Sequence, residues 1–194
     1  MRPDVTLLAF DTSAAHCAAA LLLNGTVHTH VEDMARGQGE RLMVMLEEVL
    51  AAHGQTWADL DAIAVGVGPG NFTGIRISVS AARGLALGLG KPAVGVSLFD
   101  TTQHLTNRTR VGVPAPRDQT YVMDFDTGQP PAMTNDAQGY ALSSAHGTAN
   151  HIRAMAEIAA ARLTAGGDLP RPAPLYVKAP DAAPSRDVPP VILP

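Results

Sequence analysis

Aromatic residues and cysteine are scarce in this chain of 194 residues. Phe, Trp and Tyr together make up 4% of it, whereas hydrophobic residues make up 46%. The core must therefore be built from Ala, Val, Leu, Ile and Met, whose small side chains let helices and sheets approach closely. Cys17 is the only cysteine, so no disulfide can form within the chain, which fits a reducing cytoplasm. The length suggests one domain or two small lobes.

The chain also lacks an excess of positive charge and any long apolar run. Its net charge is −4, whereas a protein that binds nucleic acid alone is usually basic, so we expect tRNA or other RNA to be reached only indirectly, through a partner. No stretch approaches the roughly 20 apolar residues that cross a bilayer. The segment 1–6 lacks the pattern of a signal peptide. We therefore expect a cytoplasmic protein without a membrane segment.

The first third of the chain predicts three antiparallel strands followed by a helix. The β-like runs are Thr6–Phe10, His16–Leu23 and Thr26–Val31, and Asn24-Gly25 between the last two is a strong hairpin signal. Apolar residues then recur at helical spacing from Gly39 to His53.

A strand, a helix, a second strand and a second helix are expected next. They are Ala62–Val65, about Gly74–Leu89, Ala93–Val96, and a helix that Ser97 caps and that runs to Leu105. Three strands, helix, strand, helix, strand is a ribonuclease-H-like order, so we predict an α/β fold.

The character of the sequence changes after Thr106. We predict one strand at Thr120–Phe125, a helix at Thr148–Ala165 and a short strand at Leu175–Lys178, with a mobile tail from Asp181. These elements are too few for a second full ribonuclease-H-like unit. The expected organisation is an N-terminal lobe of residues 1–105 and a reduced C-terminal lobe of residues 106–194 with a proline-rich tail.

The most distinctive segment is the glycine-rich turn from Gly66 to Gly74, which contains four glycines in nine positions. It joins a predicted buried strand to a predicted helix, and Thr73 is the expected N-cap of that helix. The turn is no Walker A loop, because no lysine lies between Met1 and Gly90. It also lacks the third glycine of a Rossmann fingerprint, where Asn71 stands.

Two interpretations of this turn remain open. In the first, the glycines serve close backbone packing. In the second, the turn binds a nucleotide beside a carboxylate that holds Mg²⁺ through water, so that ATP or ADP with Mg²⁺ sits at a subunit junction. The candidate nucleotide-binding residues are Asp11, Thr12, Gly68, Gly70 and Thr73.

No other catalytic or metal-binding pattern stands out. The seven histidines include no His-x-x-x-His pair, and His146 and His151 are five apart, a poor spacing for one helical face. Cys17 lies in an apolar strand and is expected to be a core residue. We therefore expect no metal centre and no catalytic residue.

The predicted helix after the glycine turn carries a stripe of small residues, with Ser80, Gly84 and Gly88 at a spacing of four. This helix is apolar nearly all round, so one face is expected to meet its own sheet and another to meet a partner helix. We predict an interface that it shares with the preceding helix. The candidate residues are Leu42, Met45, Leu46, Val49, Ile77, Ala81, Gly84, Leu85 and Gly88.

Several segments resemble the TsaB (YeaZ) family, which takes part in making threonylcarbamoyladenosine in tRNA. The carriers are Leu8–Ser13, Glu40–Met43, Asp61–Ile77, Pro92–Ser97 and Tyr176–Ala182. The Gly-Pro-Gly-x-Phe-Thr-Gly-x-Arg pattern within them is highly specific to this group. The chain departs from the usual pattern at Asn71, Ser78 and Lys178, where Ser, Gly and Arg are common.

The resemblance implies an actin, sugar kinase and Hsp70 ATPase-like fold of two ribonuclease-H-like lobes, the second reduced. It also implies a non-catalytic accessory subunit with no activity of its own. Such a subunit pairs with the catalytic protein TsaD through two helices of its first lobe, and the ATPase TsaE joins the pair. Without TsaD, the same face would form a homodimer. A nucleotide-binding enzyme that uses Asp11 and the Gly68–Thr73 turn is the alternative.

Overall fold

The computed structural model describes residues 5–177. Lys178, the last residue of the predicted strand at 175–178, and the predicted tail from residue 181 lie outside the described part. Its first sheet has five strands in the order β3-β2-β1-β4-β5. The strands are β1 (Leu7–Asp11), β2 (His16–Leu23), β3 (Thr26–Asp33), β4 (Ala62–Gly66) and β5 (Ala93–Val96). β1, β2 and β3 pair antiparallel, whereas β4 and β5 run parallel to β1.

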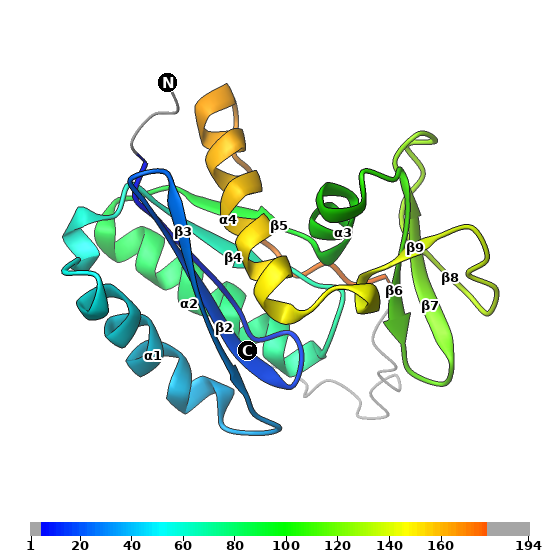
Figure 1. Ribbon diagram of the computed structural model, residues 1–194, viewed down its shortest axis with the longest axis horizontal. Helices are drawn as coiled ribbons and strands as arrows, with labels where there is room; N and C mark the ends of the chain where they lie inside the picture. Colours follow the sequence, from blue (N-terminus) through cyan, green and yellow to red (C-terminus); the bar gives the residue numbers. More distant parts are fainter. Residues whose placement is uncertain (1–4, 178–194) are drawn as a thin grey trace, which may run out of the picture.

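Helices cover both faces of this sheet (Figure 1). One face packs against α1 (Gln38–Ala52) and α2 (Phe72–Leu89), which lie side by side, and the other against α4 (Thr148–Ala165). Because both faces are covered, the inner strands β1, β2 and β4 are mainly apolar, whereas the edge strand β3 is largely polar. The Ala18, Ala19 and Ala20 side chains of β2 let the helices come close.

A second, smaller sheet has the order β8-β7-β6-β9. Its strands are β6 (Arg110–Ala115), β7 (Gln119–Asp124), β8 (Ala132–Thr134) and β9 (Ala141–Leu142). The helix α3 (Leu98–Thr106) packs on it through the buried ring of Phe99, which contacts Val111 and Val113. Two short 3₁₀ helices, η1 (Trp57–Asp59) and η2 (Ser143–Ala145), complete the elements within residues 5–177.

The expected order of the first seven elements is confirmed. The Asn24-Gly25 turn joins β2 to β3, both of its residues have positive φ, and Ser97 caps α3 by accepting a hydrogen bond from the Asp100 amide. The helix at Thr148–Ala165 and the strand near Thr120–Phe125 are also present.

Three expectations about the second half were wrong. β6 was missed because Pro114 argues against a strand. On one side β6 pairs with β7 along its whole length, but on the other side β9 pairs only with Val111 and Gly112. Pro114 therefore lies where β6 has only one neighbouring strand, and its missing amide hydrogen is tolerated there. β8 and β9 are too short for a periodic pattern. Leu175–Val177 form no strand, because Leu175 makes a single backbone bond to Val67 instead of a ladder.

A fourth error concerns the start of α2. Its N-cap is Asn71, whose side chain accepts a hydrogen bond from the Gly74 amide, and the helix begins at Phe72. Thr73 is therefore the second helical residue and not the cap.

Candidate functional site

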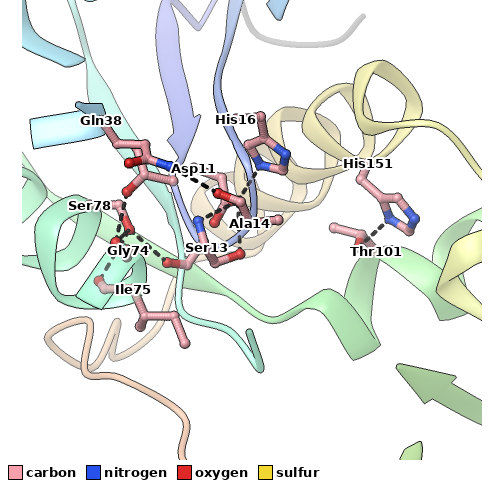
Figure 2. A network of polar contacts seen from close by, with 12 residues as sticks. Asp11, Ser13, Ala14, His16, Gln38, Gly74, Ile75, Ser78, Thr101 and His151 are labelled. Carbon is pink, nitrogen blue, oxygen red and sulfur yellow. Dashed lines mark hydrogen bonds and ion pairs between the residues drawn. The ribbon is translucent and has the colours of Figure 1, made fainter. Parts of the chain in front are cut away.

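The turn that follows β1 is built around the carboxylate of Asp11. Its Oδ2 atom accepts hydrogen bonds from the Ser13 amide (3.0 Å) and the Ser13 hydroxyl (2.9 Å), and it lies 2.8 Å from His16 Nε2 (Figure 2). The residue is only 8% exposed. These three partners of a buried carboxylate fix the turn between β1 and β2.

The glycine-rich turn packs directly against this β1 turn. A Cβ at Gly66 would lie 1.9 Å from Asp11 Oδ1, one at Gly70 2.5 Å from the Ser13 carbonyl oxygen, and one at Gly74 1.9 Å from the Thr12 carbonyl oxygen. Real Cβ atoms essentially never approach so closely. Close packing against the Asp11 side chain and against the backbone of Thr12 and Ser13 accounts for these glycines, as in the first of the two interpretations drawn from the sequence.

Hydrogen bonds hold the two turns together. The Asn71 amide donates to the Ser13 carbonyl (2.6 Å), and the fully buried Thr12 hydroxyl donates to the Gly74 carbonyl (2.7 Å). The hydroxyl of Ser78 lies within 3.2–3.4 Å of the carbonyl oxygens of Gly66, Gly74 and Ile75 (Figure 2). The start of α2 is thus bonded both to the end of β4 and to the β1 turn.

Gly68 is held from other directions. Its φ of +97° is in the region that favours glycine, and a Cβ there would meet the Ile75 side chain at 2.7 Å. Its carbonyl accepts a bond from the Leu98 amide, and the neighbouring Val67 carbonyl accepts one from Leu175. The turn therefore also anchors α3 and the extended segment after α4.

A cavity of about 250 Å³ lies beside Asp11, at the ends of β1, β4 and β5. Its other side comes from η2 and the start of α4. Three histidines line it, His16 from β2 together with His146 and His151, and we call these three the histidine wall. Alanine, valine, leucine, isoleucine and methionine side chains line its floor. The cavity thus combines a carboxylate, three imidazoles and an apolar floor.

His151 is the most constrained of these histidines. Its Nε2 lies 2.9 Å from the Ser143 carbonyl oxygen, which can only accept, so Nε2 carries the hydrogen. Its Nδ1 lies 2.9 Å from the Thr101 hydroxyl. Burial, with a smaller contribution from nearby His146, lowers the pKa of His151 below its usual value of 6.5. The neutral ring is therefore the favoured form.

The five candidate nucleotide-binding residues do not share one cavity. Asp11 and Gly68 line the cavity with the histidines, whereas Gly70 and Thr73 line a broader groove of about 1060 Å³ against the start of α1 and the β6–β7 hairpin. Thr12 lines neither of the two and has its hydroxyl bonded to Gly74. The structure brings the two turns together through the hydrogen bonds from Thr12 to Gly74 and from Asn71 to Ser13.

The histidine wall was missed by the sequence reasoning. His16 lies five residues after Asp11 across a tight turn between two predicted strands, and this spacing is a signal that could have been used. His146 and His151 were judged only by helical spacing, but His146 follows η2 and its ring meets His151 edge-on at 6.1 Å. Within residues 5–177, no three His, Cys, Asp or Glu side chains are grouped so as to hold a metal ion.

The predicted partner interface needs correction on α1. Leu42, Met45, Leu46 and Val49 are at most 6% exposed and pack in the core against the sheet, so they offer no surface to another chain. Their helical stripe is the inner face of α1.

The interface residues predicted on α2 are exposed or partly buried. Gly84 and Gly88 are exposed with open space around them, while Ile77, Ala81 and Leu85 are partly buried beside them. Ile77 reaches to 3.7 Å from the position that a Cβ on Gly39 of α1 would take, so this part of α2 borders α1.

Large exposed apolar side chains gather on these two helices. Among the described residues there are six, and four of them lie on α1 or α2: Met43, Val44, Phe72 and Leu87, the last 82% exposed. A surface of this kind is typical of a protein interface. In the part of the chain that the structure covers, no helix is long and apolar enough to span a membrane.

Comparison with known proteins assigns the family. A family model described as TsaD, tRNA N6-adenosine threonylcarbamoyltransferase, matches residues 29–126, half of the chain. The TsaB protein of Escherichia coli K12 is 42% identical over 95 residues, which are 49% of this chain and 41% of that protein. The solved structure of YeaZ from Pseudomonas aeruginosa superposes with a TM-score of 0.69 at 27% identity, over 89% of this chain and 99% of that one. The chain belongs to the TsaB (YeaZ) family.

Family membership comes with a difference in length and a close link to TsaD proteins. The matched region spans about two fifths of the curated TsaB protein from E. coli. A tRNA N6-adenosine threonylcarbamoyltransferase from Jannaschia is 50% identical over 114 residues, covering 48% of this chain and 32% of that enzyme. The mixed α/β architecture with two sheets is the one that the YeaZ structure shares.

Proposed function

We propose that the chain is a non-catalytic scaffold subunit for threonylcarbamoyladenosine modification of tRNA, and that it acts by pairing with TsaD. Membership of the TsaB family supports the pathway, since the E. coli relative is described as a tRNA threonylcarbamoyladenosine biosynthesis protein. The single structural observation that carries the pairing is the exposed apolar surface that Met43, Val44 and Leu87 supply on α1 and α2. On this proposal the chain also supports recruitment of the ATPase TsaE.

The contact surface is the outer side of the two helices, where they lie next to each other (Figure 1). Gly84 and Gly88 present backbone without side chains, so a partner helix can approach closely, and Met43 and Leu87 supply apolar area beside them. On α1, this proposal assigns the partner contact to the exposed residues Met43 and Val44 and no longer to the buried residues predicted from the sequence. Without TsaD, the same surface would be covered by a second copy of the chain, because a self-complementary patch favours a two-fold contact.

Two further parts of the proposal concern the fold. The chain is divided into a lobe of residues 1–105 and a reduced lobe of residues 106–194, related to the actin, sugar kinase and Hsp70 ATPase-like folds. The two separate sheets support this division, although α3 packs on the second sheet and α4 on the first.

Restoration of the modified nucleoside tests the proposed function. The chain would be co-expressed with TsaD and TsaE from the same genome in a strain depleted of its own TsaB, and threonylcarbamoyladenosine would be measured by mass spectrometry of digested tRNA. We expect the nucleoside to return only when both the chain and its TsaD are present. Its absence with all three proteins soluble would refute the proposal.

The cavity beside Asp11 keeps a second candidate in view, a nucleotide-binding enzyme. In support, Asp11 Oδ1 has no hydrogen bond within the described residues, and the cavity of about 250 Å³ opens next to it. Calorimetric titration of ATP with Mg²⁺ into the protein decides the matter. Heat of binding that Asp11→Ala abolishes would favour the enzyme, whereas no heat would leave only the scaffold.

A further inference from the structure

An exposed cluster of two aromatic rings and an arginine lies at the start of α2, away from the cavity of Asp11. The Phe72 and Tyr176 rings are stacked, with centroids 5.0 Å apart and planes 28° apart. The Arg76 guanidinium lies 3.9 Å from the centre of the Phe72 ring, and its Nε donates to the Tyr176 hydroxyl at 2.9 Å. Phe72 is 41% exposed and Tyr176 37%. These large side chains are thus ordered by each other and still open to solvent.

A second arginine continues this surface along the helix. Arg83 is exposed and lies seven residues after Arg76, two helical turns further on nearly the same side of α2. We call Phe72, Arg76, Arg83 and Tyr176 the arginine–aromatic surface. Gly84 and Gly88 lie on the neighbouring side of α2, toward the border with α1, and Leu87 lies between the two sides.

The charges of this surface lack an acidic counterpart. Within residues 5–177, neither Arg76 nor Arg83 forms an ion pair with a carboxylate. The helix α2 contains no Asp or Glu, and neither does the extended segment 169–177 that brings Tyr176 against it. In a chain of net charge −4, this is a local region of positive charge.

We propose that the arginine–aromatic surface binds a single-stranded segment of RNA. Unpaired bases stack on exposed aromatic rings, and positively charged side chains beside them contact the phosphates, which is how proteins commonly bind single strands. In Arg76, the Tyr176 hydroxyl uses only Nε, so the two terminal nitrogens can donate to a phosphate. The inference rests on the proposed function, because tRNA is the RNA that would supply the strand, and it gives the chain a direct contact with that tRNA.

Fluorescence anisotropy with a labelled RNA hairpin that carries a single-stranded loop tests the proposal on the full chain at about 50 mM salt. We expect the logarithm of the association constant to fall linearly with the logarithm of the salt concentration, with a slope of about −1.4. Each of the two arginines contributes about −0.7 to this slope when it contacts a single strand. Arg83→Gln should make the slope less steep, at about −0.7. Phe72→Leu should weaken binding about tenfold with little change of slope.

Arg108→Gln is the matched control, since it removes the same charge from an exposed residue between α3 and β6. It should leave binding unchanged. The proposal is overturned if the unaltered chain does not bind the hairpin, or if Arg108→Gln weakens binding as much as Arg83→Gln does.

Co-purification with TsaD separates this proposal from the proposed function. We expect Phe72→Leu and Arg83→Gln to keep TsaD bound while they lose RNA. Loss of TsaD with RNA binding intact would show that the surface is a protein interface and would overturn the RNA assignment. If neither the unaltered chain nor any variant binds RNA, while TsaD still co-purifies and tRNA is still modified, the RNA proposal is overturned and the proposed scaffold function stands.

Discussion

Gly74 is a glycine at which the fold has no room for a side chain. A Cβ there would overlap the Thr12 carbonyl oxygen, which is backbone and cannot swing away, and the Thr12 hydroxyl is bonded to the Gly74 carbonyl. Gly84, ten residues further along the same helix, has no other atom within 4 Å of the position that a Cβ would take. The same residue type thus serves packing at one position and an open surface at the other.

Substitution of these two glycines should act in opposite directions. Gly74→Ala is expected to lower the free energy of unfolding by about 2 kcal/mol or more, because the β1 turn must move. Gly84→Ala should raise it by about 0.5–1 kcal/mol, because alanine favours the helix. Urea unfolding followed by circular dichroism measures both, and equal effects of the two changes would contradict this packing.

His151 gives the fold a dependence on pH. Its pKa is lowered in the folded protein, so the unfolded chain binds the proton more readily and stability is lost as pH falls below the ordinary value of 6.5. Above that value the contribution is complete.

The pH dependence should shrink when this histidine is replaced. We expect the free energy of unfolding to fall between about pH 7.5 and pH 5.5 in the unaltered chain, and to fall less in His151→Gln, whose amide can still donate to the Ser143 carbonyl. Urea midpoints at several pH values provide the comparison. Identical pH profiles would show that His151 does not titrate differently on folding.

At the scale of the element, α2 is the helix whose start matters most, because it touches β4, the β1 turn and the segment after α4. Asn71 caps it by accepting the Gly74 amide, and its own amide is bonded to Ser13. The sequence reasoning placed the cap at Thr73, since threonine is a good N-cap and the glycines obscured the true boundary. A turn packed so tightly shifts the start of the helix by two residues, which local preference alone does not reveal.

Cap substitutions distinguish the two positions. Asn71→Ala should cost about 1 kcal/mol of stability, Asn71→Ser should cost much less because serine also accepts the amide, and Thr73→Ala should have little effect. Thermal unfolding of the three variants measures this. A larger loss for Thr73→Ala than for Asn71→Ala would restore the boundary predicted from the sequence.

At the scale of the whole molecule, the sequence was sufficient for the first sheet and insufficient for the second. Apolar runs mark β1 and β2, the Asn24-Gly25 turn marks the start of β3, and apolar residues recur at helical spacing along α1. The second sheet depends on strands of two and three residues and on one strand that contains Pro114, and such pairing is decided by tertiary contacts.

The candidate sites show the same division. The contact between the β1 turn and the glycine turn was within reach, because both follow predicted strands. The histidine wall was not, since the sequence predicted the helix that carries His151 but neither η2 nor the packing of that helix beside Asp11. On α1, helical periodicity correctly identified which residues share one apolar face. Periodicity alone does not say whether the chain's own sheet or a partner covers that face.

The central claim is that the open side of α1 and α2 binds TsaD, and co-purification of affinity-tagged TsaD with the chain measures it directly. Gly84→Glu adds a large charged side chain to that side without an overlap within the chain, and Ala161→Glu adds the same side chain to an exposed position on α4, across the sheet. We predict that Gly84→Glu abolishes co-purification, that Ala161→Glu retains it, and that both variants unfold at temperatures close to that of the unaltered chain. Retention of TsaD by a folded Gly84→Glu protein would contradict the account.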